Sequence, residues 1–165
     1  QWFIASKLKS RSLEDQKKRG QFQVIWCDID KNPPSLGELC ARVENILSGC
    51  DYIAYTTKSA TANNQNSRVV VPLLKTLTYD DWHLGQKTFN DALEAAGIKV
   101  DRCSEKASQL GFLPTRGPFY DYKIKLLVDE IIQDLKGIKV KRLSRAQTNT
   151  DGLLESCLLR KGAAD

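Results

Sequence analysis

The chain has 165 residues, of which 41% are hydrophobic and 27% are charged, and its formal net charge is +5. This length and this balance predict one globular domain with a substantial core, and they exclude wholesale disorder. No apolar run approaches the roughly 20 residues that span a bilayer, and no signal peptide is evident, so we expect a soluble cytoplasmic protein without membrane contact. The positive charge favours a polyanionic partner.

Other features of the sequence argue against several kinds of functional site. The five cysteines contain no C-x-x-C pair, so we expect reduced thiols and no zinc site. The only histidine, His83, excludes a two-histidine metal site, and the lack of a Walker-type loop argues against ATP hydrolysis by this segment. The chain starts at Gln1 and has no methionine, which indicates a piece of a longer reading frame.

Positive charge gathers in two short runs near the start of the chain. The runs consist of Lys7, Lys9 and Arg11, and of Lys17, Lys18 and Arg19. Because lysine and arginine bind backbone phosphates, both runs are candidate nucleic-acid contacts.

The first predicted element is a strand. Residues 21–30 alternate between two faces, as a half-buried strand does. A turn follows, and Ser35 with Glu38 has the spacing of a capping box, so a helix should begin there and end at Gly49.

Two more strands should form a β-hairpin. Residues 51–57 and 68–73 are rich in aromatic and β-branched side chains, and the polar segment 58–67 between them has turn composition. A second helix, capped by Thr78 or Asp80, follows this hairpin.

The remaining predicted elements are two short strands and a third helix. The strands are at 98–100 and 109–113, and residues 124–135 have apolar residues at helical spacing. The order β-α-β-β-α-β-β-α predicts an α+β fold, namely an RRM-like, mostly antiparallel sheet packed with helices. From 137 onward we expect a partly disordered linker or C-terminal extension.

Asp28 and Asp30 are the strongest chemical signal. Two carboxylates at i and i+2 of a strand end project from one face and repel each other unless a cation lies between them. Mg²⁺ is a natural partner for such oxygen ligands, and Asp101, at a further strand edge, is the candidate third ligand. The alternative is that these acids are solvated residues beyond a strand end.

The polar loop offers groups that can hold a triphosphate. Lys58, Ser59 and Thr61 supply charge and hydroxyls, and Arg68 opens an otherwise apolar strand, where an arginine often has a dedicated anionic partner. An ordinary solvated hairpin loop is the alternative for this segment.

Residues 20–122 resemble the archaeo-eukaryotic primase superfamily, in particular the primase-polymerase domains of prophages and plasmids. The order and spacing of several motifs carry the resemblance. The motifs are the strand that ends at Asp28 and Asp30, the segments 55–61 and 68–73, Val100 with Asp101, and 109–114 with Arg116.

The resemblance implies roles for these residues. In that family the first acidic pair and a later hydrophobic-Asp motif bind the catalytic metals, which here implies Asp28, Asp30 and Asp101. A Ser-x-His motif contacts the incoming nucleotide, which implies Ser59 and Arg68 as nucleotide contacts.

This sequence departs from the family at the middle motif. A histidine is expected near position 60, where this sequence has Ala60 followed by Thr61. Either Lys58 and Thr61 take over the phosphate contact, or the residue was altered, or the activity is weakened. Arg116 is a further candidate for nucleotide binding.

The resulting hypothesis is a DNA primase or primase-polymerase that replicates a mobile element such as a prophage or plasmid. It would use two Mg²⁺ or Mn²⁺ ions, nucleoside triphosphates and a single-stranded DNA template. Residues 1–136 would be the catalytic domain, truncated at its N-terminus, and 137–165 the extension. The resemblance also allows a downstream helicase domain or other replication proteins as partners.

Two alternatives remain open at this point. One is a non-catalytic module that binds single-stranded nucleic acid on an RRM-like sheet, with Trp26, Tyr52 and Tyr55 exposed for base stacking. The other is a metal-dependent nuclease that uses the same acids.

Overall fold

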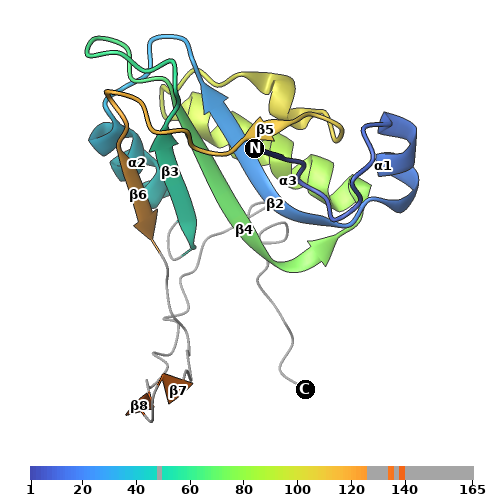
Figure 1. The fold of residues 1–165 in the computed structure, drawn as a ribbon. Helices are drawn as coiled ribbons and strands as arrows, with labels where there is room; N and C mark the ends of the chain where they lie inside the picture. The colour runs from blue at the N-terminus through green and yellow to red at the C-terminus, as the bar shows by residue number, and fades with distance from the viewer. Residues whose placement is uncertain (48–49, 126–133, 136–137, 140–165) are drawn as a thin grey trace.

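The computed structural model describes residues 1–47, 50–125, 134–135 and 138–139 (Figure 1). Three α-helices and antiparallel strands make up this part of the chain, so the α+β prediction is confirmed. The elements are β1 (Trp2–Phe3), α1 (Leu13–Arg19), β2 (Phe22–Ile29), α2 (Leu36–Ile46), β3 (Tyr52–Thr56), β4 (Ser67–Leu77), α3 (Tyr79–Ala95), the 3-10 helix η1 (Arg102–Glu105), β5 (Gly111–Phe112), β6 (Tyr122–Lys125), β7 (Asp134–Leu135) and β8 (Ile138–Lys139).

Four strands form the central sheet in the order β2-β4-β3-β6, and all of their pairings are antiparallel. The register sets opposite faces for alternate residues, so that Cys27, Val69 and Ala54 share one face. All three are fully buried. Helices α2 and α3 lie across this face, which makes it the main core of the molecule (Figure 1).

The other face of the sheet is only partly covered. The short ribbon formed by β1 and β5 lies in front of β2 in Figure 1, and Phe3 packs edge-on against Trp26 with ring centroids 5.6 Å apart. Farther across the sheet, Ile53, Tyr122 and Ile124 are exposed. One face therefore carries the core, and the other is open for contact.

The start of α2 follows the predicted capping chemistry, and the start of α3 does not. Ser35 accepts a hydrogen bond from the Glu38 backbone and Glu38 reaches back to the Ser35 backbone, so the capping box is present at α2. Thr78 is the N-cap residue of α3, although its side chain does not cap the backbone. Gly97, just past α3, has φ of +78°, a left-handed conformation that favours glycine and turns the chain back toward the sheet.

Several predicted elements are wrong or incomplete. Residues 98–100 are not a strand, because only Asp101 makes a single bridge to the sheet. The strand predicted at 109–113 is reduced to β5, since just two residues pair with β1. Helix α1 and η1 were not predicted, because each is short and held by local caps.

The helix predicted at 124–135 is wrong at its start. Ile124 lies in strand β6 and pairs with Ile53 of β3, because pairing with an open sheet edge outweighs a local helical pattern. Leu135 lies in β7. Residues 126–133 and the predicted extension after 139 lie outside the described residues. In the described part of the chain, no helix combines the length and apolar character needed to cross a membrane.

Candidate functional site

Asp28 and Arg68 form a buried ion pair across the sheet. They face each other in the register of β2 and β4, and their residues are 8% and 6% exposed. Nε of Arg68 donates to Oδ1 of Asp28 and Nη2 donates to Oδ2, both at 2.6 Å. This two-pronged geometry is a strong form of charge-assisted hydrogen bonding. The dedicated anionic partner expected for Arg68 is therefore Asp28.

Two other groups hold the Arg68 guanidinium. Its Nη1 donates to the backbone carbonyl of Phe112 in β5, and its charge lies 5.1 Å from the centre of the Trp26 ring. The arginine thus joins β4, β2 and the β1–β5 ribbon. Because these contacts of Arg68 are shielded from water, loss of any one of them should weaken the others.

Asp101 reaches the sheet from the segment after α3. Ile98 and Val100 are buried and anchor this segment against the core. The Asp101 backbone N–H then donates to the Asp28 carbonyl at 2.7 Å, which is the single bridge between them. Its exposed side chain accepts a hydrogen bond from the Cys103 backbone at 2.9 Å and caps η1.

Asp30 lies just beyond the end of β2 and is exposed. Its carboxyl pKa is raised, first by partial burial and then by the negative charges of Asp28 and Asp101, while Arg68 lowers it. That pattern places the Asp28 and Asp101 carboxylates within electrostatic reach of Asp30. The structure therefore brings the three predicted acids together at one end of β2.

The donor chemistry of this cluster fits a hard divalent cation such as Mg²⁺ or Mn²⁺, because carboxylate oxygens are its preferred ligands. As arranged here, no group of three His, Cys, Asp or Glu residues in the described segments is set to hold a metal. Both Asp28 oxygens are bonded to Arg68. A cation at Asp28 thus requires Arg68 to release at least one of them.

A polar cavity of about 370 Å³ opens beside Asp30, and its lining does not include Asp28 or Asp101. Asp30, Lys58, Ser59 and Arg68 line it, together with Tyr55, Thr57 and residues 112–115. Ser59 is fixed by a hydrogen bond between its hydroxyl and that of Thr57 at 2.9 Å and by one that it accepts from the Asn66 amide at 3.1 Å. Four of the predicted site residues thus share one cavity wall.

Three other positions of interest do not line this cavity. Thr61 is exposed and forms a bridge with Asn64 at the tip of the hairpin loop. Arg116 is exposed beyond the cavity lining. Ala60 is buried, and its N–H donates to the Thr57 carbonyl at 3.0 Å.

The predicted basic runs lie away from the acids. All six side chains are exposed, and Arg19 pairs with Asp15 while Lys17 lies over the Tyr79 ring. Lys7 donates its N–H to Gln21, so both runs flank the start of β2. The acids lie at the opposite end of β2, about 20 Å away at the usual rise per strand residue.

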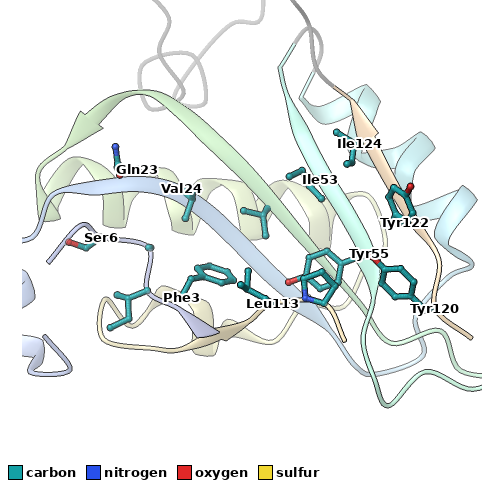
Figure 2. Close-up of a pocket in the computed structure, with 14 residues that line it drawn as sticks. Phe3, Ser6, Gln23, Val24, Ile53, Tyr55, Leu113, Tyr120, Tyr122 and Ile124 are labelled. Atoms are coloured by element: carbon teal, nitrogen blue, oxygen red, sulfur yellow. The ribbon is translucent and has the colours of Figure 1, made fainter. Parts of the chain in front are cut away.

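An apolar trough of about 460 Å³ runs over the open face of the sheet (Figure 2). Figure 2 shows it extending from Ser6 and Gln23 to Tyr120 and Tyr122, whose rings stack with centroids 5.8 Å apart. Tyr55, Leu113 and Pro114 line both this trough and the polar cavity, so the two adjoin.

The aromatic residues proposed for a stacking platform do not provide one. Trp26, Tyr52 and Tyr55 are between 0% and 3% exposed. The exposed ring on this face is Tyr122 instead. It was missed because its segment has the apolar spacing of a helix, and only the pairing of β6 with β3 shows which way it faces.

The sequence reasoning also missed the part played by β5. The Phe112 carbonyl holds Arg68, and Leu113, Pro114 and Thr115 form a wall of the polar cavity. No side-chain signal marks a backbone carbonyl as an arginine acceptor. The turn residues after Leu113 were the only available hint that this segment lies at the surface.

Comparisons with models of protein families, with curated proteins and with solved structures find no match to this chain.

Proposed function

We propose that this chain catalyses template-directed nucleotidyl transfer, as a primase or primase-polymerase domain. The observation that carries the proposal is the meeting of Asp28, Asp30 and Asp101 at one end of β2, where Asp30 lines a polar cavity. The like charges of Asp30 and its neighbours raise the free energy of the site without a cation, and a divalent ion relieves this repulsion. The motif order that resembles the archaeo-eukaryotic primase superfamily supports the same reaction.

The cavity side chains suit a nucleoside triphosphate. Lys58 supplies a charge, Ser59 and Thr57 supply hydroxyls, and Arg68 supplies a guanidinium on the same wall. Mg²⁺ or Mn²⁺ held by the three acids would polarise the attacked phosphate as a Lewis acid and would activate the attacking hydroxyl by favouring its deprotonation. The protein itself contributes mainly by positioning the reactants and excluding water.

Arg68 has a double task under this proposal. In the structure it neutralises Asp28, which keeps a buried carboxylate from standing alone. If Asp28 released an oxygen to a cation, Arg68 would keep its bond to the Phe112 carbonyl, and its freed N–H groups would be available to phosphate oxygens. The arginine would then support the fold before binding and the nucleotide afterwards.

The apolar trough is the surface we assign to unpaired bases of the template. Its walls include the exposed Tyr122 ring and the half-buried Tyr120 ring, and aromatic rings stack on bases without regard to sequence. It adjoins the polar cavity at Tyr55, so a base in the trough lies next to a nucleotide in the cavity. The exposed lysines near Ser6 are at the far end and suit the strand's phosphates.

The test is primer synthesis on a single-stranded DNA template with nucleoside triphosphates and Mg²⁺ or Mn²⁺. Asp30→Asn is the sharpest variant, because Asp30 is exposed and its side chain makes no hydrogen bond to another described residue. We expect its activity to fall about 100-fold or more, as when one group that stabilises transition-state charge is removed. Asp80→Asn, an exposed carboxylate in the first turn of α3, is the matched control and should retain activity.

The same assay separates the alternatives. Full activity of Asp30→Asn would contradict the proposal. Release of nucleotides from DNA without added triphosphates would favour a nuclease. If the protein binds single-stranded DNA without metal and without Asp30, and synthesises no primer, a non-catalytic module is favoured.

A further inference from the structure

The outer edge of β2 is closed by side chains of α3. Strand β2 is at the end of the sheet order, and in the described segments only residues 5–7 and the Asp101 bridge pair with this edge. Nε1 of Trp82 donates to the Val24 carbonyl at 3.0 Å. The Gln86 amide then makes two bonds to Trp26, accepting from its N–H at 3.0 Å and donating to its carbonyl at 2.7 Å.

The distance between successive contacts along α3 matches the distance between them along β2. Trp82 and Gln86 are four residues apart, which is about 6 Å along a helix. Val24 and Trp26 are two residues apart, which is about 6.6 Å along a strand. Because the two steps agree, α3 follows the strand edge as a neighbouring strand would. The next step in this register brings Asn90 level with Asp28.

At that level Asn90 bonds to η1 and not to β2. Its Nδ2 donates to the Ser104 hydroxyl at 3.2 Å and to Glu105 at 3.0 Å. The Ser104 hydroxyl in turn donates to the Asp101 carbonyl at 3.4 Å, and Gln86 Nε2 lies 3.4 Å from Ser104 Oγ. The Asp101 N–H takes the vacant place on the strand edge, at the Asp28 carbonyl.

These polar groups are completely enclosed. Gln86, Asn90 and Ser104 are each 0% exposed. A buried amide or hydroxyl that loses its partner costs about 1–3 kcal/mol, so their mutual bonds fix one arrangement strongly. An apolar helix face would cover the same area, but it would not specify where the backbone of residue 101 meets the strand.

We propose that Gln86, Asn90 and Ser104 are positioning residues, which act through Asp101 by holding it in register beside Asp28. The inference rests on the proposed function, since it concerns the third carboxylate of the metal site. It adds a supporting network that connects the strand carrying Asp28 and Asp30 to the turn carrying Asp101. Supporting groups of this kind change metal affinity about 10- to 100-fold when they are removed.

The test compares Ser104→Ala and Asn90→Ala in the full chain with Thr88→Ala as control. Thr88 is in the same helix, and its hydroxyl donates to the Leu84 carbonyl at 2.8 Å. The first measurement is hydrogen exchange of single backbone amides by NMR without metal. The second is the affinity for Mn²⁺ alone, measured by electron paramagnetic resonance.

We expect both variants to lose protection at the Asp101 amide at least about tenfold more than at the Val69 amide in the sheet core. Their Mn²⁺ affinity should fall about 10- to 100-fold, and the control should match the wild type. A purely structural role would lower protection evenly across the sheet and leave Mn²⁺ affinity unchanged in the folded protein. Either of these results would overturn the inference.

The two proposals fail in different ways. If wild-type protein binds no Mn²⁺, the proposed function is contradicted, and the metal part of this inference falls with it. If wild-type protein binds Mn²⁺ and Ser104→Ala binds it equally well, only the positioning role is contradicted. Ser104→Ala removes a single oxygen, so it keeps the test open if Asn90→Ala does not fold.

Discussion

Replacing Asp28 with asparagine should destabilise the fold strongly. The change keeps the size of the side chain but places an NH₂ group against the Arg68 guanidinium, so one of two 2.6 Å bonds becomes a contact between donors. The arginine, in a residue that is 6% exposed, loses its compensating charge. Breaking a buried pair in this way costs about 3–5 kcal/mol. Because the negative charges of Asp30 and Asp101 partly compensate that of Arg68, we expect a loss of about 3 kcal/mol.

That loss is a large part of the 5–15 kcal/mol that holds a typical domain together. The assay is urea unfolding at pH 7, followed by fluorescence of tryptophan, since Trp26 lies next to Arg68. Lys87→Gln is the control, because it breaks the exposed pair with Asp91, which is worth only about 0.3–0.5 kcal/mol. A loss below about 1 kcal/mol for Asp28→Asn would refute the reasoning.

A double variant separates the contribution of the Asp28–Arg68 pair to the free energy of unfolding from the destabilisation caused by an unpaired Arg68. In the double variant Asp28→Leu with Arg68→Met, no buried charge remains. Apolar replacement of a buried pair is often close to neutral, so the double variant should be more stable than Asp28→Asn. If it is less stable, the strength of the pair itself has been underestimated.

Three other predictions concern single positions. Asp30→Asn should be at least as stable as wild type at pH 7, because the raised pKa of Asp30 means that its ionised form is disfavoured in the folded state. This difference in stability should vanish as the pH falls below the ordinary pKa of 3.8, and urea unfolding at several pH values checks it. Ser35→Ala should lose about 1 kcal/mol in the same titration, since it removes half of the capping box with Glu38; no loss would show that the cap is unimportant. Gly111→Ala should cost about 1–3 kcal/mol, because the added Cβ would lie 2.4 Å from the Phe3 ring, and wild-type stability would show that the β1–β5 ribbon yields freely.

Local pattern was enough to predict the strand that carries Asp28 and Asp30. Alternation of side chains fixes which residues share a face, and a strand end is marked by the turn that follows it. The same reasoning gave Arg68 an anionic partner. It did not give the identity of that partner, because α2 and β3 separate β2 from β4 in the chain, so neither strand alone specifies the register between them.

The contacts that hold Asp101 could not be predicted from its own segment. Residues 98–100 have strand composition, yet the edge of β2 is already occupied by Trp82 and Gln86 from α3. Only the last position of that edge is left for Asp101. Such competition for one row of backbone groups depends on how the helix lies against the strand, which the spacing of residues in α3 alone does not reveal.

Strand β6 shows a similar limit. The apolar spacing around Ile124 fits a helix, but the free edge of β3 offers backbone hydrogen bonds to whichever segment reaches it. The pairing puts Tyr122 and Ile124 on the open face and Lys123 on the helix side, where it pairs with Glu44 at 2.6 Å. A tertiary partner thus outweighs local preference in this segment.

The most direct test of the central claim is a titration of the full chain with Mn²⁺, followed by electron paramagnetic resonance, for wild type, Asp30→Asn and Asp80→Asn. If the acids at the end of β2 form one cation site, wild type and the Asp80 variant bind Mn²⁺ alike. Asp30→Asn then binds at least about tenfold more weakly while keeping its fold. Equal binding by all three proteins, or none by wild type, would contradict the account.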